Sequence, residues 1–563
     1  MTKEEFNRYF TYHQIKEALD GYVRAYPQFI KVEEIGKSYE GRAIWLVTVT
    51  NFETGDDRDK PAFWLDANIH SAELAGTTAC LYLIDNLVTN YGTSPDISRC
   101  LDTRVFYICP RVNPDGAELA LADVPRLIRS GTRPYPYQED ATAGLVPEDM
   151  DGDGRVLSMR IKDDHGPWKI CETEPRLLVA REPAEIGGTY YRVLPEGRIH
   201  NYDGLTIHVP PAKEGLDLNR NFPSEWKPES EQKGAGSYPG SEQEVQALIR
   251  FIAEHKNICG GVAFHSYSGV LLRPYSFKSD DTMPAEDLWT YQKIGAKGTE
   301  LTGYPSVSAF KEFQYHPQKV ISGAFDDWLY EEQGIYGWTA ELWSPQRQAG
   351  IENYKYIDWY RDHPLEDDRK LLAWSDSMLG GQGYIDWYEF DHPQLGKVEL
   401  GGWNPLFSFW NPPPEMLQQE IAPFANWLVW HNLIGPRLEI QEVKAESLAY
   451  DTYRIQMLVV NSGWLPSYCT KQALNRNLVR GVVCEIQLPE GAQLIGGPDR
   501  QEVGQLEGRA YKNPSIIGWA GISSDTTDDR VKTEWFIRAK TGSVIEVSAR
   551  HERAGKAHKS FVL

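Results

Sequence analysis

Along the first part of the chain, apolar residues recur with the period of a helix in some segments and with the period of a strand in others. These segments predict helices and strands in turn. The predicted elements are a helix at 12–26, strands at 30–35, 43–49 and 62–69, a helix at 73–91 and a strand at 104–109. Strands that alternate with helices are typical of an α/β layer structure with a largely parallel sheet.

The same pattern continues after a long interruption. Ser241 and Glu244 have the spacing of a capping box ahead of an apolar helix at 245–252, which leads into a strand that ends at His265. A further strand is expected at 336–341. Ligands of such sheets bind at the carboxyl ends of the strands.

The interruption covers about residues 134–211 and is rich in Pro, Gly and Asp, with little helical period. We interpret it as a long excursion from the sheet. Loops of that length in a compact domain are usually functional.

The composition changes after a final apolar helix at 415–433. Aromatic residues ahead of it, between Trp403 and Trp410, are expected to be core. Beyond residue 435 the apolar residues alternate with a period of two, which predicts a small antiparallel β-sandwich. The 563 residues therefore divide into a catalytic-type domain at 1–435, with the insertion at 134–211, and an all-β domain at 436–563.

Charge and composition exclude some classes of partner. The formal net charge of −22 argues against nucleic acid and anionic membranes, because both require a basic face. No apolar run is long enough for a spanning helix. The first residues lack the pattern of a signal peptide, so we expect a cytoplasmic protein unless an export signal has been trimmed. The seven cysteines show no pairwise spacing and are expected to be buried free thiols.

Two histidines and a glutamate stand at the ends of predicted strands. His70 and Glu73 follow one apolar run, and His265 ends another. A lone histidine is more often solvated or packed in a core, and the His-x-x-Glu spacing alone is weak. Two imidazoles and one carboxylate are nevertheless the set that holds a catalytic zinc ion and leaves one position for water.

Four ordered motifs strengthen this interpretation. They are His70-Ser-Ala-Glu73, Val112-Asn-Pro-Asp-Gly116, Gly215-Leu-Asp-Leu-Asn-Arg-Asn-Phe-Pro223 and His265-Ser-Tyr-Ser268. Together they resemble the zinc carboxypeptidase family typified by carboxypeptidase A, over roughly residues 10–345. The resemblance implies a mixed, largely parallel eight-stranded sheet flanked by helices.

The resemblance also implies roles for single residues. His70, Glu73 and His265 match the family's zinc ligands. Glu341, in Trp338-Thr-Ala-Glu-Leu, matches the general base that takes a proton from water and passes it to the leaving amine.

Further matches concern the substrate. Asn219 and Arg220 resemble the pair that grips a free carboxylate. Arg129 matches the arginine that stabilises the oxyanion, with Arg133 as the alternative. Asp217 resembles the carboxylate that orients a zinc-bound imidazole.

The substrate pocket departs from the family pattern at two positions. Lys319 stands where the family has a mobile capping tyrosine, so either Tyr315 substitutes or the cap is absent. Asp326 falls on the pocket floor, where a carboxylate would favour Lys- or Arg-like side chains. The neighbouring pair Asp326-Asp327 is equally open to a structural role.

Asp149, Asp151 and Asp153 have the spacing that opens a calcium loop. Arg160 occupies the place of the expected bidentate Glu. The segment is therefore either a calcium site or an Asp-rich turn.

Three functions remain open. The first is a zinc-dependent metallocarboxypeptidase acting on a peptide or peptide-like substrate with a free carboxylate, with a preference for basic terminal residues if Asp326 faces the pocket. The second is a zinc hydrolase of cell-wall peptides or N-acyl amino acids, suggested by the insertion at 134–211. The third is an inactive zinc-containing binding protein, which the presence of Glu341 disfavours.

Overall fold

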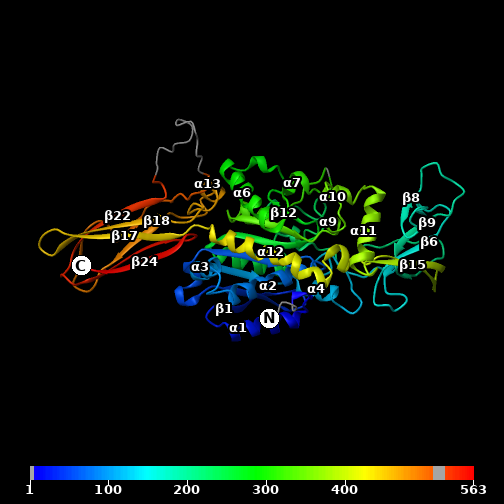
Figure 1. Cartoon of the computed structure of the whole chain (residues 1–563), viewed down its shortest axis with the longest axis horizontal. Helices are drawn as coiled ribbons and strands as arrows, with labels where there is room; N and C mark the ends of the chain where they lie inside the picture. The colour runs from blue at the N-terminus through cyan, green and yellow to red at the C-terminus, as the bar shows by residue number, and fades with distance from the viewer. Residues whose placement is uncertain (1–5, 317, 512–526) are drawn as a thin grey trace.

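The centre of the computed structural model, which describes residues 6–316, 318–511 and 527–563, is an eight-stranded sheet (Figure 1). Its strand order is β1-β2-β4-β3-β11-β14-β12-β13. The strands are β1 (Ile30–Lys37), β2 (Ala43–Val49), β3 (Ala62–Ala67), β4 (Val105–Cys109), β11 (Ile258–Ser266), β12 (Val270–Arg273), β13 (Ser306–Ser308) and β14 (Tyr336–Leu342). The four inner strands β4, β3, β11 and β14 pair in parallel, which confirms the predicted mixed, largely parallel sheet.

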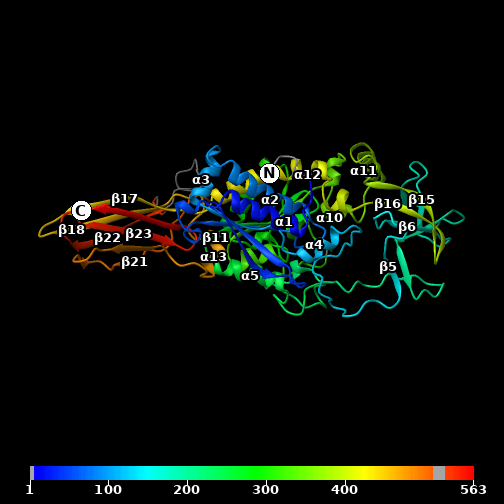
Figure 2. The same ribbon diagram turned by 90° about the horizontal axis from the view of Figure 1, so that it is seen from below.

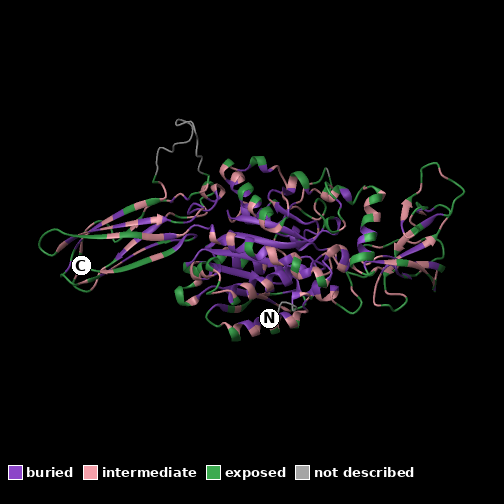
Figure 3. Ribbon diagram, in the orientation of Figure 1, coloured by how far each residue is buried: buried purple, intermediate pink, exposed green. Residues whose placement is uncertain are grey.

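Helices cover both faces of this sheet. One face carries α1 (Tyr12–Ala25), α2 (Ala75–Thr89), α3 (Pro95–Thr103), α6 (Ala285–Thr302) and α12 (Pro414–Leu433), and the other carries α5 (Gln243–Glu254) and α8 (Phe325–Glu331). Successive residues of β3 point to opposite faces, so Phe63 and Leu65 join one core and Trp64 joins the other. The inner strands β3, β4, β11 and β14 are buried along their whole length, and they lie in the purple centre of Figure 3.

The start of α5 differs from the capping box that the sequence predicts. The N-cap residue is Glu242, and it makes no side-chain cap. The Ser241 hydroxyl donates to the Glu242 carboxylate, while the buried Glu244 carboxylate accepts the Tyr39 N–H. Tertiary partners therefore occupy both side chains that the local pattern assigned to the helix end.

The excursion contains short strands joined by long connections. Four of its strands belong to a six-stranded antiparallel sheet: β6 (Ser158–Lys162), β7 (Trp168–Ile170), β8 (Leu178–Ala180) and β9 (Tyr191–Pro195). The other two strands of this sheet are β15 (Tyr384–His392) and β16 (Gly396–Trp403). The excursion also forms a separate two-stranded sheet from β5 (Gly144–Pro147) and β10 (Gly197–His200). The six-stranded sheet lies at one end of the molecule (Figures 1 and 2). Arg160 of β6 pairs with Glu399 of β16 at 2.9 Å, although 239 residues separate them.

The last part of the chain forms two four-stranded antiparallel sheets at the opposite end of the molecule (Figure 1). They are β17 (Leu438–Ser447), β18 (Thr452–Asn461), β22 (Arg530–Arg538) and β20 (Gln493–Gly496), and β21 (Arg500–Glu502), β19 (Val483–Gln487), β23 (Val544–His551) and β24 (Gly555–Val562). They enclose their own core, in which alternate residues of β18 and β22 meet. The exact domain boundary at residue 435 stays a prediction.

A buried carboxylate joins this end of the chain to the central sheet. Asp287 of α6 accepts hydrogen bonds from the hydroxyls of Tyr330 and Tyr336 and from the N–H groups of Lys471 and Gln472. The last two open the short helix α13 (Lys471–Asn475), where a carboxylate is favourable.

No helix among the described residues is long and apolar enough to cross a membrane. All seven cysteines are free and buried, which confirms the prediction of buried thiols.

His431 of α12 makes stability depend on pH. Its ring is 3% exposed, and neither ring nitrogen has a hydrogen-bond partner among the described residues. Burial lowers the pKa of His431 to about 3, below the ordinary value near 6.5. The unfolded chain therefore binds a proton that the folded chain excludes, and stability falls as pH drops below 6.5. We expect His431 to account for a loss of about 2 kcal/mol between pH 7.5 and pH 5.0.

Urea unfolding of His431→Leu at the two pH values measures this loss, because the variant should lack that share of the pH dependence. His13→Leu, at an exposed position, should keep it. A His431→Leu variant as acid-sensitive as the parent would contradict the assignment.

Candidate zinc centre

The ends of two neighbouring parallel strands deliver the three predicted metal ligands. After β3 the chain turns at Asn68, whose φ of 60° is left-handed and whose carboxamide donates to the carbonyls of His70 and Ser71. Glu73 follows within the same turn, just ahead of α2. His265 is the penultimate residue of β11, the strand next to β3.

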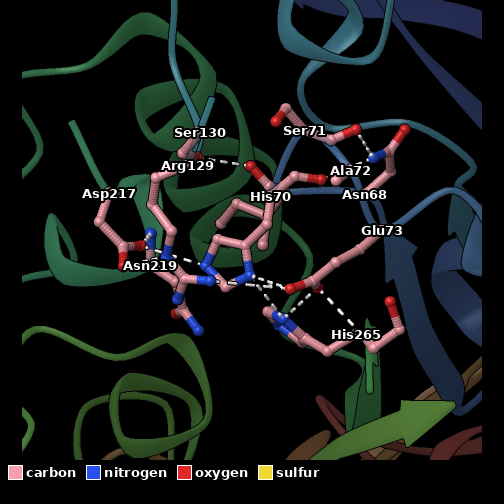
Figure 4. A network of polar contacts seen from close by, with 12 residues as sticks. Asn68, His70, Ser71, Ala72, Glu73, Arg129, Ser130, Asp217, Asn219 and His265 are labelled. Carbon is pink, nitrogen blue, oxygen red and sulfur yellow. Dashed lines mark hydrogen bonds and ion pairs between the residues drawn. The ribbon is translucent and has the colours of Figure 1, made fainter. Parts of the chain in front are cut away.

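The ligand atoms converge (Figure 4). Nδ1 of His70 lies 2.8 Å from Oε1 of Glu73, and Nδ1 of His265 lies 2.9 Å from Oε2 of the same carboxylate. The two Nδ1 atoms are 3.1 Å apart. All three side chains are buried.

This arrangement fits a zinc ion. Two Nδ1 atoms that face each other can share only one proton, whereas a dication accepts a lone pair from both. Tetrahedral zinc with Zn–N distances of 2.0–2.1 Å would space its ligand atoms by roughly 3.3 Å, close to the separations found here. Burial alone would raise the pKa of Glu73, but His70 and His265 outweigh it and lower the pKa, which favours the ionised, metal-binding form.

Asp217 orients the first imidazole. Its Oδ1 lies 3.1 Å from Nε2 of His70, and its Oδ2 accepts a hydrogen bond from Nε of Arg129 at 2.9 Å. Burial would raise the pKa of Asp217, but Arg129, Arg220 and His70 together lower it well below the ordinary value. An ionised carboxylate on Nε2 directs Nδ1 of His70 toward the metal position.

The structure separates the two candidate oxyanion arginines. Arg129 lines the central cavity, and its Nη1 lies 3.8 Å from the Glu73 carboxylate. Arg133 is bound instead by Glu242, which accepts from its Nε at 2.9 Å and from its Nη2 at 2.7 Å. Arg133 does not line the cavity, so the structure favours Arg129 of the two, and the oxyanion role stays a prediction.

Glu341 stands beside His265. The two residues are paired in register on the adjacent parallel strands β14 and β11, and Glu341 faces the same cavity as His70. Burial, and then the charge of Glu73, raises the pKa of Glu341 well above its ordinary value. A carboxylate with a raised pKa is a stronger base.

The cavity has a volume of about 350 Å³, and polar and aromatic groups share its wall. Its lining consists of His70, Glu73, Arg129, Asp217, Arg220, Gln232, Lys233, Ser266, Tyr267, Ser268, Phe313, Tyr315, Glu341, Ile357, Tyr360 and Trp410. Tyr267 contacts both Tyr360 and Trp410 edge-on, with ring centroids 5.2 Å apart in each pair. Trp410, which the sequence assigns to the core, therefore belongs to the cavity wall.

The predicted carboxylate clamp is only partly in the cavity. Arg220 lines it, whereas Asn219 does not. The Asn219 side-chain oxygen accepts the Phe325 N–H at 2.8 Å, and its backbone oxygen accepts from Nη1 of Arg220. In this arrangement Asn219 holds the guanidinium in place.

The structure brings Tyr315 to the cavity, whereas Lys319, which stands at the family's capping position, does not line it. The Tyr315 ring is about half exposed, and its backbone oxygen accepts a hydrogen bond from Arg361. Desolvation raises the pKa of the Tyr315 phenol, which also lies in the electrostatic field of Arg129 and Glu341. Lys319 hydrogen-bonds through its N–H to the carbonyl of His316.

Asp326 is not at the surface of the cavity. It is 3% exposed in the first turn of α8, and burial raises its pKa. The adjacent Asp327 accepts the Ser276 N–H. The helix start keeps both carboxylates in the interior, so the prediction of a carboxylate on the pocket floor is not borne out by the lining.

The acidic loop gives calcium no support. Asp149, Asp151 and Asp153 lie close enough to share an ion, but their oxygens already accept hydrogen bonds from backbone N–H groups of the same loop. Asp153 is also paired with Arg155, and Asp151 accepts from the Tyr388 hydroxyl.

Comparison with known proteins assigns the chain to a family. A family model described as zinc carboxypeptidase matches residues 15–154 and 180–361, which is more than half of the chain. The chain belongs to the zinc carboxypeptidase family. The resemblance found in the sequence motifs is thereby confirmed. A second model, a domain of unknown function (DUF8731), matches residues 437–562.

Individual relatives are distant. Carboxypeptidase A1 of Mus musculus is 24% identical over 363 residues, covering 63% of this chain and 66% of the relative. Carboxypeptidase B2 of Bos taurus is 23% identical over 349 residues, covering 60% and 63%. The chain thus matches less than two thirds of the length of either relative. Among solved structures, thrombin activatable fibrinolysis inhibitor matches with a TM-score of 0.44 and 18% identity, covering 77% of each chain, and carboxypeptidase A of Helicoverpa armigera with a TM-score of 0.42 and 18% identity, covering 76% of this chain and 73% of its own.

Sequence reasoning missed the aromatic wall. Tyr267 lies inside the motif His265-Ser-Tyr-Ser268, so its position beside the metal ligands was a usable signal. Tyr360 lies at the end of the family match and Trp410 beyond it, and no local pattern distinguishes either from a core aromatic.

Replacing Asp217 by Asn tests its role as the partner of His70. We expect zinc affinity to fall 10- to 100-fold, because a neutral amide orients the imidazole less firmly. Competition with a chromogenic chelator measures this affinity. Asp115→Asn is the matched control, since Asp115 is a buried carboxylate that binds Ser38 and Arg42 and does not contact the ligands. Equal zinc affinities in the two variants would refute the role of Asp217.

Proposed function

We propose that this protein is a zinc-dependent carboxypeptidase that releases the C-terminal residue of peptide-like substrates. The observation that carries the proposal is one cavity lined by the metal ligands His70 and Glu73, by Glu341 and by Arg220. The third ligand, His265, lies 2.9 Å from the Glu73 carboxylate.

Each group has a task in such a reaction. A bound zinc ion would polarise the scissile carbonyl and lower the pKa of water to about 7. Glu341 takes the proton of the attacking water and delivers it to the nitrogen of the leaving amine. Arg129 donates hydrogen bonds to the oxygen on which negative charge develops. Arg220 binds the free carboxylate of the substrate, which a planar guanidinium does with two parallel hydrogen bonds.

The lining supports apolar rather than basic side chains in the substrate. A basic preference rested on Asp326, which the cavity lining does not include, whereas Lys233 lines the cavity and would repel a cation. Phe313, Tyr267 and Trp410 present aromatic surface instead. We therefore propose that substrates with apolar residues next to the scissile bond are preferred.

The two alternative functions receive less support. Specialisation for cell-wall peptides was suggested by the insertion at 134–211, but none of the described residues that line the cavity comes from it. An inactive binding protein would lack the base, whereas Glu341 stands in register with His265.

Release assays test the activity. Zinc-loaded protein is mixed with N-blocked dipeptides ending in Phe, Leu, Arg or Glu, and with a muropeptide, and the freed amino acids are quantified. We expect kcat/KM to be higher for terminal Phe and Leu than for terminal Arg. Release from the muropeptide alone would favour the second function, and stoichiometric zinc without any release would favour the third.

Glu341→Gln isolates the base. The amide cannot accept the proton of water, so kcat is expected to fall by about 100- to 10,000-fold. Zinc stoichiometry should remain at the parental value, because Glu341 is not among the convergent ligands. Metal analysis and initial rates check both parts, and unchanged turnover in the zinc-loaded variant would overturn the proposal.

A further inference from the structure

The helix that follows the metal ligands does not cap itself. The N-cap residue of α2 is Leu74, which has no side-chain acceptor for the first N–H groups. Apolar residues are among the poorest caps. The Leu74 N–H has one local acceptor, the Ala72 carbonyl at 3.1 Å, and these buried N–H groups take a further acceptor from elsewhere in the chain.

Asn411 is that partner. Its Oδ1 accepts the N–H groups of Leu74 at 2.8 Å and Ala75 at 3.0 Å. Its Nδ2 donates to the carbonyls of Ala72 at 2.7 Å and Leu406 at 3.0 Å. The residue is fully buried, and both donors and both acceptor positions of the carboxamide are used.

Two of these four bonds bracket Glu73. The Ala72 carbonyl and the Leu74 N–H belong to the two peptide groups on either side of the Glu73 backbone. The Glu73 N–H is itself donated to the His70 carbonyl. With both flanking peptides fixed, the direction of the Glu73 Cα–Cβ bond is fixed, and the carboxylate is aimed at the two imidazoles.

The segment that carries Asn411 is firmly anchored. The Trp343 indole N–H donates to the Ser408 carbonyl at 2.8 Å. The Tyr9 ring stacks on Phe407 with centroids 4.9 Å apart, and the Tyr9 hydroxyl donates to the Pro412 carbonyl. Through these contacts, residues 406–412 connect Tyr9 and Trp343 to the turn that carries His70 and Glu73. Residues 406–412 lie outside the family match.

We infer that Asn411 is a positioning residue for the metal centre, acting through the backbone of Glu73. The inference rests on the zinc centre of the proposed function. Partners that orient a metal ligand typically change metal affinity 10- to 100-fold when they are removed.

Asn411→Leu tests this, with Asn461→Leu as the matched control. Asn461 is equally buried in β18, and its carboxamide also makes four backbone bonds: it accepts from Arg437 and Gly463 and donates to Leu465 and Glu507. Both variants lose four buried hydrogen bonds, so a general loss of stability should be similar in the two. Only the first should change the metal site.

Zinc affinity by chelator competition and the visible absorption of the Co²⁺-loaded protein are the readouts. We expect Asn411→Leu to bind zinc 10- to 100-fold more weakly and to shift the Co²⁺ spectrum, and Asn461→Leu to match the parent in both. Equal affinities and spectra in the two variants would overturn the inference.

Asn411→Asp keeps the test decisive if the Leu variant does not fold. The carboxylate still accepts from Leu74 and Ala75, and it is favourable at a helix N-terminus, but the donors to Ala72 and Leu406 are lost. We expect a several-fold loss of zinc affinity together with a lower melting temperature, because the new carboxylate oxygen faces two buried carbonyls. Parental zinc affinity in the folded variant would count against the inference. Because these readouts need no turnover, a parent that binds zinc but releases no amino acid would refute the proposed function and leave the role of Asn411 standing.

Discussion

Parallel pairing of β11 with β3 on one side and β14 on the other is the constraint on which the centre depends. It places His265 and Glu341 at the same level of adjacent strands and brings the turn after β3 alongside them. Side chains alternate between faces along a strand, so a slip of one residue would turn either group away from the cavity. The inner strands are apolar and buried on both faces of the sheet. A slip of one residue would exchange the side chains of the two cores, so the packing of these cores fixes the register.

The second constraint is electrostatic. Three buried carboxylates, Glu73, Asp217 and Glu341, face one cavity, and buried charges are costly unless they are paired. Their surroundings separate the pKa values of the three groups. Arg129 and His70 lower the pKa of Asp217, and the two imidazoles lower that of Glu73. Burial and the charge of Glu73 raise the pKa of Glu341. Two groups are thereby ionised for binding and one is adjusted for proton transfer, which is the division of tasks that a metal-assisted hydrolysis requires.

Local patterns in the sequence were sufficient for the central sheet and for the metal ligands, because long apolar strands and the motif around His70 carry their information within a few residues. They were insufficient where the partner is distant. The strands of the excursion have three to five residues each, so their period was too short to recognise, and β6 takes its partner β16 from a distant part of the chain. Trp410 was misplaced, and Asp326 was left open between the pocket and the interior, because the side of an element that faces a cavity is decided by its packing.

Buried asparagines explain how turns at the strand ends can be both irregular and rigid. Such turns leave backbone N–H and C=O groups without regular partners, and each carboxamide offers two donors and two acceptor positions. Asn113 accepts from Gly116 and donates to the carbonyls of Ile69 and Ser130, which ties the His70 turn to the segment of Arg129. Asn411 does the same for Glu73. A carboxamide has no charge, so it fixes these turns without disturbing the metal site. An aspartate in the same position would compete with the ligands for the cation, and a lysine would repel it.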